Sequence, residues 1–257
     1  MLNYMRSEWY RIFHTKALWV FTGVLAGLLL AMNAVLYLMG RGDPRFPYST
    51  IRFSLSPLLS NMLMMGCSGL ALASILFSDK SQGGIMKNAV AYGISRTRIF
   101  AGKCILSSAA AFLSMLVILA VYVGSALWLL DGEWEPYVQI LIRGVLANLP
   151  FAVACVILFV AFQQFLGREI LAILPWLGIV YVLPLICLYA GFQFEPLGKI
   201  AKWLPYNYLQ LEVQVNMSQY ECLWMNSQGM LKCLVSGFAG IGFFLILGVC
   251  LNHRKEL

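Results

Sequence analysis

The chain of 257 residues is 61% hydrophobic and only 11% charged, and its formal net charge is +7. The mean hydropathy of +0.79 is higher than the surface of a soluble globular protein tolerates. The composition therefore excludes a soluble domain and predicts an integral membrane protein, whose basic excess reflects membrane orientation rather than nucleic-acid binding.

The first sixteen residues have the pattern of an amphipathic helix. Met5, Trp9, Ile12 and Phe13 recur at helical spacing. The opposite, exposed side is polar and carries Arg6, Ser7, Glu8 and Arg11. Such a helix lies in the plane of the interface and buries its apolar face among the acyl chains. We therefore expect residues 1–16 to form an interfacial helix along the cytoplasmic headgroups rather than a disordered tail.

Six apolar stretches follow, each long enough to cross the hydrocarbon core. A bilayer core of about 30 Å needs about 20 residues of helix, and backbone groups in lipid must bond within their own segment. The sequence therefore predicts an all-α integral membrane fold, a single transmembrane domain over residues 1–257. Its six transmembrane helices are expected at 17–39, 58–77, 105–130, 145–165, 170–190 and 230–251.

The charges of the connecting segments predict the orientation. An even number of spans places both termini on one side of the membrane. With the N-terminus inside, the cytoplasmic segments hold eleven basic and four acidic residues, whereas the outer segments hold seven of each. Because basic residues concentrate on the cytoplasmic side, we expect both termini to be cytoplasmic.

Catalytic chemistry has few candidates in this sequence. Residues 66–69 read GCSG and match the GxSG pattern of intramembrane serine proteases, which would make Ser68 a nucleophile. Such a serine needs a neighbouring base, but the two histidines, His14 and His253, lie in the end segments. Zinc-binding, nucleotide-binding and paired-cysteine motifs do not occur in the sequence. We therefore expect no enzyme activity, no metal and no cofactor in this chain.

The predicted spans carry no Asp, Glu, Lys or Arg at their centres. Ion-coupled transporters and channels usually place charged or carbonyl-lined sites there, so both classes are disfavoured. The polar residues that enter the spans are neutral. Either hydrogen bonds between helices or contacts with a cargo account for them.

The connection between the second and third spans, residues 78–104, is the most basic one. Residues 85–92 have the pattern of a short helix. Gly93 suits its left-handed end, and Ser95 can cap the next helix. An ordinary basic cytoplasmic loop is the competing interpretation, because orientation alone would produce such a segment.

This connection resembles the one found in permeases of the ABC-2 type. An acidic residue is followed by glycine and a Lys-Asn pair, then Gly-x-Ser-Arg, and a basic residue leads into the third span. The matching positions are Asp79, Gly84, Lys87, Asn88, Gly93, Ser95, Arg96 and Lys103. The resemblance extends to the N-terminal helix with Glu8, Tyr10 and Arg11 and to the Trp203-Leu204-Pro205 segment before the sixth span.

The resemblance implies a permease subunit of a bacterial ABC exporter in the cell membrane. The short helix in residues 78–104 would be the coupling helix, seated on a separate cytoplasmic ATPase subunit that binds ATP and Mg. The residues expected to couple to the ATPase are Ile85, Lys87, Asn88, Gly93, Ser95 and Arg96. The assembly would contain two ATPase subunits and a second permease copy, as a homodimer or with a close paralogue, surrounded by membrane lipids.

The family places its translocation path at the permease interface, lined chiefly by spans one, two and five. The residues expected there in this chain are Asn33, Ser60, Asn61, Met64, Met65 and Ser68. Flexible methionines suit varied apolar ligands, so we expect a hydrophobic or amphipathic cargo, with a peptide toxin or antimicrobial peptide favoured. A non-transporting peptide immunity or sensor protein, and a lipid or polysaccharide exporter, are the alternatives.

The longest connection, residues 191–229, lies between the fifth and sixth spans on the outer side. Its amphipathic segments, interrupted by Pro205, predict short outer helices. Pro175 and Pro184 predict a kink in the fifth span. Free, buried thiols are the favoured interpretation of the scattered cysteines, while a disulfide among Cys187, Cys222 and Cys233 stays open.

Overall fold

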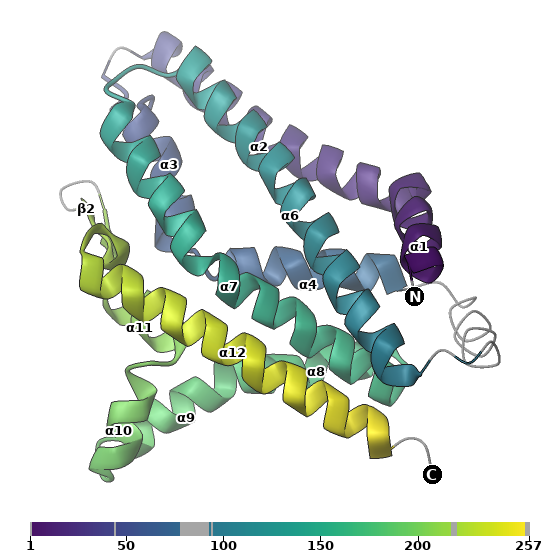
Figure 1. Ribbon diagram of the computed structural model, residues 1–257. Coiled ribbons are helices and arrows are strands. Elements are labelled where there is room, and N and C mark those ends of the chain that lie inside the picture. The colour runs from purple at the N-terminus through teal and green to yellow at the C-terminus, as the bar shows by residue number, and fades with distance from the viewer. Residues whose placement is uncertain (1, 44, 78–92, 94, 217–219, 255–257) are drawn as a thin grey trace.

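The computed structural model describes residues 2–43, 45–77, 93, 95–216 and 220–254. Over these residues the chain forms a bundle of helices with a small hairpin at one end (Figure 1). Five of the described helices are long and apolar enough to cross a membrane, or six if one bent pair is a single span. The predicted all-α membrane class is therefore confirmed. The five are α2 (Lys16–Gly42), α6 (Arg96–Leu129), α7 (Glu135–Leu166), the stretch from α8 to α9 (Glu169–Ala190) and α12 (Ser227–Arg254).

The two ends of the chain lie at the same end of the bundle (Figure 1). The N-terminal helix α1 (Leu2–His14) lies there and continues into α2 after Thr15. Thr15 donates a hydrogen bond to the carbonyl of Arg11 at 2.8 Å, and the indole of Trp19 donates to the carbonyl of Phe13 at 2.7 Å. These bonds hold the two helices at a fixed turn.

The second span differs from the expected segment over 58–77. It consists of α3 (Ile51–Ser60) and α4 (Met64–Phe77), which meet at an angle of 70°. Pro57 removes a backbone donor inside α3, and Asn61 leaves the helical region, with its backbone and side-chain nitrogens both donating to the Pro57 carbonyl. Thr50 caps α3 by accepting from the Phe53 amide at 3.3 Å, so the helix begins earlier than the apolar run.

Helix α7 is the centre of the bundle. Every residue from 154 to 161 is buried, and α7 packs against α4, α6, α8 and α12. A helix that is apolar around its whole circumference is suited to this position, because neighbours cover it on all sides. The other long helices each keep an exposed apolar face, which suits contact with lipid.

Glycines allow two helices to approach α7 closely. A Cβ atom added at Gly69 of α4 would lie 2.8 Å from a methyl of Val156, and one added at Gly66 would lie 3.0 Å from the Cys155 sulfur. On α12, a Cβ at Gly237 would lie 2.7 Å from the Pro150 side chain. Gly66 and Gly69 therefore act as small packing residues, as is common for helices in lipid.

The fifth span changes its helical pitch between its two prolines. Helix α8 (Glu169–Leu177) contains Pro175, a π-helical turn η1 spans Gly178–Val182, and α9 (Leu183–Ala190) begins with Pro184 at its first turn. The Leu183 amide bonds the Gly178 carbonyl, five residues back. The prolines predicted a kink in this span, and the structure has a π-helical segment between them.

The connection after α9 contains two short helices, α10 (Glu195–Ala201) and α11 (Pro205–Leu211), as expected around Pro205. The hairpin of β1 (Gln214–Val215) and β2 (Tyr220–Glu221) and a 3-10 turn η2 (Leu223–Met225) then lead into α12. All seven cysteines are free. The disulfide left open among Cys187, Cys222 and Cys233 is not formed.

Candidate functional site

The apolar side of α1 packs against α4 and α6. Its Ile12 is buried in a cluster with Leu72 and Leu76 of α4 and with Leu106 and Ala110 of α6. Helix α4 ends one residue before position 78, and α6 begins at position 96. One face of α1 therefore contacts both helices that flank the connection predicted to couple to an ATPase.

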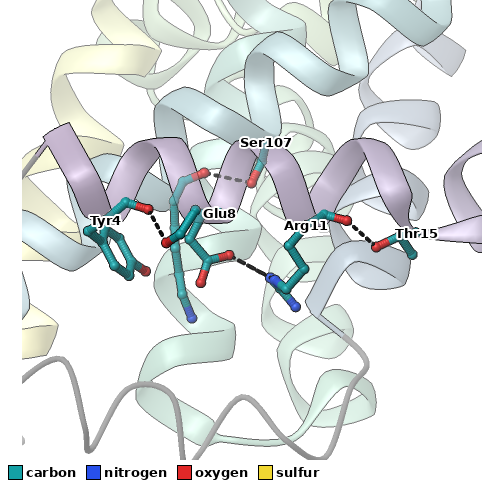
Figure 2. A network of polar contacts seen from close by, with 7 residues as sticks. Tyr4, Glu8, Arg11, Thr15 and Ser107 are labelled. Carbon is teal, nitrogen blue, oxygen red and sulfur yellow. Dashed lines mark hydrogen bonds and ion pairs between the residues drawn. The ribbon is translucent and has the colours of Figure 1, made fainter.

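The polar side of α1 is also partly buried. Tyr4, Glu8 and Arg11 point to the same side of α1 (Figure 2), and we call them, together with Lys103 of α6, the α1–α6 polar cluster. Glu8 is only 4% exposed. Its carboxylate accepts from Arg11 Nη2 at 2.7 Å and from Arg11 Nε at 3.0 Å.

Lys103 brings a second cation close to this carboxylate. It is 8% exposed. Burial is the main influence on its amine, and the opposing charges of Glu8 and Arg11 also act on it. The Ser107 hydroxyl donates to the Lys103 carbonyl at 2.6 Å (Figure 2). Burial, and next the charge of Glu8, raise the pKa of Tyr4, so its phenol stays protonated. Glu8 thus pairs with Arg11 of its own helix and acts electrostatically on Lys103 of α6, which links α1 to α6.

The residues expected to couple to an ATPase are only partly within the described chain. Ile85, Lys87 and Asn88 lie outside the described residues. Gly93 has φ of +80°, the left-handed conformation expected for a helix end. Gly93 and Ser95 are both exposed.

Ser95 stands at the N-cap position of α6, as expected, with extended backbone angles. Its side chain makes no capping hydrogen bond, so that part of the prediction is not met. Arg96, the first residue of α6, is half-buried. The structure thus places three of the six expected residues at the start of α6, on the flank of the connection.

The residues expected along a translocation path occupy three different environments. Asn33 of α2 is completely buried. Its amide nitrogen donates to the Tyr122 carbonyl at 3.1 Å and to the Ser125 hydroxyl at 2.8 Å, and its oxygen accepts from Ser54 at 2.6 Å. The Tyr122 hydroxyl in turn donates to the Ser54 carbonyl. This network joins α2, α3 and α6, so Asn33 acts within the chain.

Ser60, Asn61 and Met64 lie at the break between α3 and α4. Ser60 donates to the Ser56 carbonyl at 2.9 Å and reaches the Val215 carbonyl of the hairpin at 3.3 Å. Asn61 is exposed, and Met64 is 61% exposed. Met64 is therefore the expected path residue whose apolar side chain is exposed.

Met65 and Ser68 line a pocket between α4, α6 and α7 instead. The pocket is partly open to the surroundings, and its other walls include Ser108, Phe112 and Met115. Ser68 donates to the Met65 carbonyl at 2.9 Å, so its hydroxyl is already bonded within α4. The six residues therefore do not form one continuous surface.

Two features of the site were not predicted from the sequence. Glu8 was placed on the exposed side of the interfacial helix, although it is buried. Tyr122 and Ser125, three residues apart in an apolar stretch, were not recognised as partners of Asn33. Polar residues at helical spacing within a span are the signal that points to such a network. Within the described part of the chain, His, Cys, Asp and Glu form no group that could hold a metal ion.

Comparison with known proteins agrees with this architecture. A family model described as an ABC-2 family transporter protein matches residues 4–185, from α1 into α9. No curated protein and no solved structure matches the chain. The family match covers well over half of the sequence and includes α1, both flanks of the basic connection and the central helix α7. The chain therefore belongs to the ABC-2 transporter family.

Proposed function

We propose that the chain is the membrane-spanning permease subunit of an ATP-driven exporter, energised by a separate ATPase subunit. Membership of the ABC-2 transporter family carries this proposal. The sequence has no nucleotide-binding motif, and in this proposal the energy comes from a partner ATPase rather than from an ion gradient. In this proposal ATP and Mg bind to the ATPase, and two permease copies work with two ATPase subunits in a bacterial cell membrane, with the chain's termini in the cytoplasm.

The packing of α1 supports the way in which the ATPase would drive the permease. Residues 85–96 would contact the ATPase, and the connection that contains them starts at the end of α4 and leads into α6. Helix α1 contacts both α4 and α6, through Leu76 and Lys103 among others, and passes into α2 after one residue. A displacement of the connection would therefore be transmitted to α2 through α1 as well as through α4 and α6.

A hydrophobic or amphipathic cargo, with a peptide toxin or antimicrobial peptide favoured, fits the exposed apolar side chains on α2 and α4. Trp19, Leu28, Val35 and Met64 are all exposed in the single chain. In this proposal a second permease copy covers part of that surface, and the cargo passes along the remainder. Asn61 and Met64 are the expected path residues that remain open to such a cargo.

The proposal is tested by co-expressing the chain with candidate ATPases and replacing Lys87, Asn88 and Arg96 by Asp. We expect the wild-type chain to copurify with an ATPase, and the replacements to abolish both the complex and ATP-driven transport. Arg143→Asp is the matched control, because Arg143 is an exposed arginine of α7 far along the chain from the connection. Survival of complex and transport in the triple variant would contradict the coupling assignment.

The cargo is tested with the purified complex in lipid vesicles. Amphipathic peptides are expected to stimulate ATP hydrolysis, and a flat response over a series of such peptides would reject the cargo preference. A chain that binds peptide but never associates with an ATPase would instead be a peptide sensor or immunity protein.

A further inference from the structure

Three segments meet around Arg52 in the first turn of α3. The guanidinium carbon lies 5.5 Å from the ring centre of Tyr220 on β2 and 6.0 Å from that of Tyr137 in the first turn of α7. The two rings lie 4.9 Å apart and are inclined by 66°. We call these three residues the Arg52 cage.

The cage is held by several contacts. The Tyr220 hydroxyl donates to the Arg52 carbonyl at 3.4 Å, and Ser56 donates to the same carbonyl at 2.7 Å. Val215 pairs with Tyr220 in the hairpin. A cation over an aromatic face within about 6 Å is attracted to the ring, and this contact uses none of the N–H donors of the guanidinium. The rings therefore position the side chain without occupying its N–H donors.

No carboxylate of the described chain neutralises this cation. Over the described residues Arg52 takes part in no ion pair, and its Nε is buried without a hydrogen-bond partner. Glu221 follows Tyr220 on the strand, so its side chain points to the opposite, exposed face. Burial raises the pKa of Tyr220 to about 12, so the phenol is neutral and does not act as the counter-ion.

The location of the Arg52 cage indicates which anion is abundant near it. Helices α3 and α7 both begin here, at the end of the bundle opposite the two termini (Figure 1). Helix ends with tyrosine and arginine are typical of the headgroup layer, where phosphate groups are the abundant anions. A guanidinium fork matches a phosphate with two parallel hydrogen bonds.

We propose that the Arg52 cage is an anion site for a phosphate group, supplied either by a phospholipid headgroup or by free phosphate. Arg52 is half-buried, and the rings of Tyr137 and Tyr220 restrict the position of its guanidinium group. The site is separate from the surfaces assigned to the ATPase and the cargo, and its test requires neither transport nor an ATPase.

Binding is measured on the purified full chain in detergent by native mass spectrometry. The probes are phosphatidylglycerol, diacylglycerol with the same acyl chains, and inorganic phosphate. Wild type is expected to bind phosphatidylglycerol roughly tenfold more tightly than diacylglycerol, the effect of about one charge-assisted hydrogen bond. Arg52→Gln is expected to remove this preference, whereas Arg143→Gln, at an exposed arginine of α7, leaves it unchanged. Arg52→Lys keeps the charge without the fork and is expected to give an intermediate value.

Competition by inorganic phosphate distinguishes the two sources. If millimolar phosphate displaces phosphatidylglycerol from wild type, the phosphate group alone is recognised; without displacement the site takes the lipid. Equal binding of diacylglycerol and phosphatidylglycerol by wild type overturns the proposal without relying on any variant. Unchanged phosphatidylglycerol binding in a folded Arg52→Gln protein also overturns it and leaves the cage a purely structural contact.

Discussion

Replacing Glu8 by Gln removes the carboxylate of the α1–α6 polar cluster while keeping the shape of the side chain. The 4% exposed Glu8 compensates Arg11, at 2.7 Å, and the buried Lys103. Removing one partner of a buried ion pair costs about 3–5 kcal/mol. Arg11 is a quarter exposed, and solvent screens its share, so we expect the free energy of unfolding to fall by about 3 kcal/mol.

The loss of Lys103 has a smaller expected effect, because Glu8 then still has Arg11. Lys103→Met in the wild-type background should lower the free energy of unfolding by about 1 kcal/mol. In the Glu8→Gln background the same change removes one of two cations that repel each other, so it should cost nothing or restore stability. The two substitutions are therefore expected to be non-additive by about 1–2 kcal/mol.

The measurement is the free energy of unfolding in detergent, from titration with a denaturing detergent, for the two single variants and the double variant. Lys199→Met is the control, since it breaks an exposed ion pair with Glu195 and should change stability by no more than about 1 kcal/mol. If Lys103→Met has the same effect with and without Glu8, the two residues do not act as a pair and the description of the cluster is wrong.

Three further predictions rest on single contacts. Asn33→Leu should lower the free energy of unfolding by about 2–3 kcal/mol, because it leaves buried polar groups of α3 and α6 unpaired. Gln228→Leu, at an exposed position of α12, should change it by less than about 0.5 kcal/mol. Equal effects of the two changes would contradict the network. Gly237→Ala places a methyl 2.7 Å from a proline side chain and 2.8 Å from a backbone nitrogen of α7 and should cost about 1–3 kcal/mol. A Cβ atom added at Gly23 has no neighbour within 4 Å, so Gly23→Ala should be neutral or stabilising. Equal thermal stability of the two variants in detergent would refute the close approach of α12 to α7. Burial raises the pKa of Cys222 from 9.0 to about 12. At pH 9 a variant that keeps only this cysteine should therefore react with N-ethylmaleimide at least about a hundredfold more slowly when folded than when unfolded, because half of the thiol is ionised in the unfolded form. Similar rates would show that the thiol is not buried.

The long helices could be predicted because lipid leaves an apolar segment few choices. Backbone groups must bond within the segment, so each apolar run of about 20 residues reads as a helix. The ends were less predictable. Helix α6 begins at Arg96 rather than near position 105, since the polar first turns are covered in part by α1 and need no apolar side chains. The break after Ser60 follows from Pro57 and Asn61, residues whose effect on a helix depends on what surrounds them.

The candidate site shows the same division. Residues 93–96 could be assigned to the start of a helix from local patterns alone, because a left-handed glycine and an N-cap residue act on their immediate neighbours. Asn33 could not be assigned in this way. Its partners Tyr122 and Ser125 lie 89 and 92 residues away, and nothing in the intervening sequence indicates that α2 and α6 pack with these residues face to face.

Hydropathy, charge and short motifs are local properties of the chain, so the helical membrane class, the basic connection and the motif typical of the ABC-2 family could be recognised without a structure. Three other features became visible only in the folded chain: Glu8 is buried near Lys103, Asn33 bonds inside the chain, and two tyrosines lie against Arg52. Burial and pairing depend on residues that are distant in the sequence, so the same polar side chain can be exposed, hydrogen-bonded or positioned to bind a ligand.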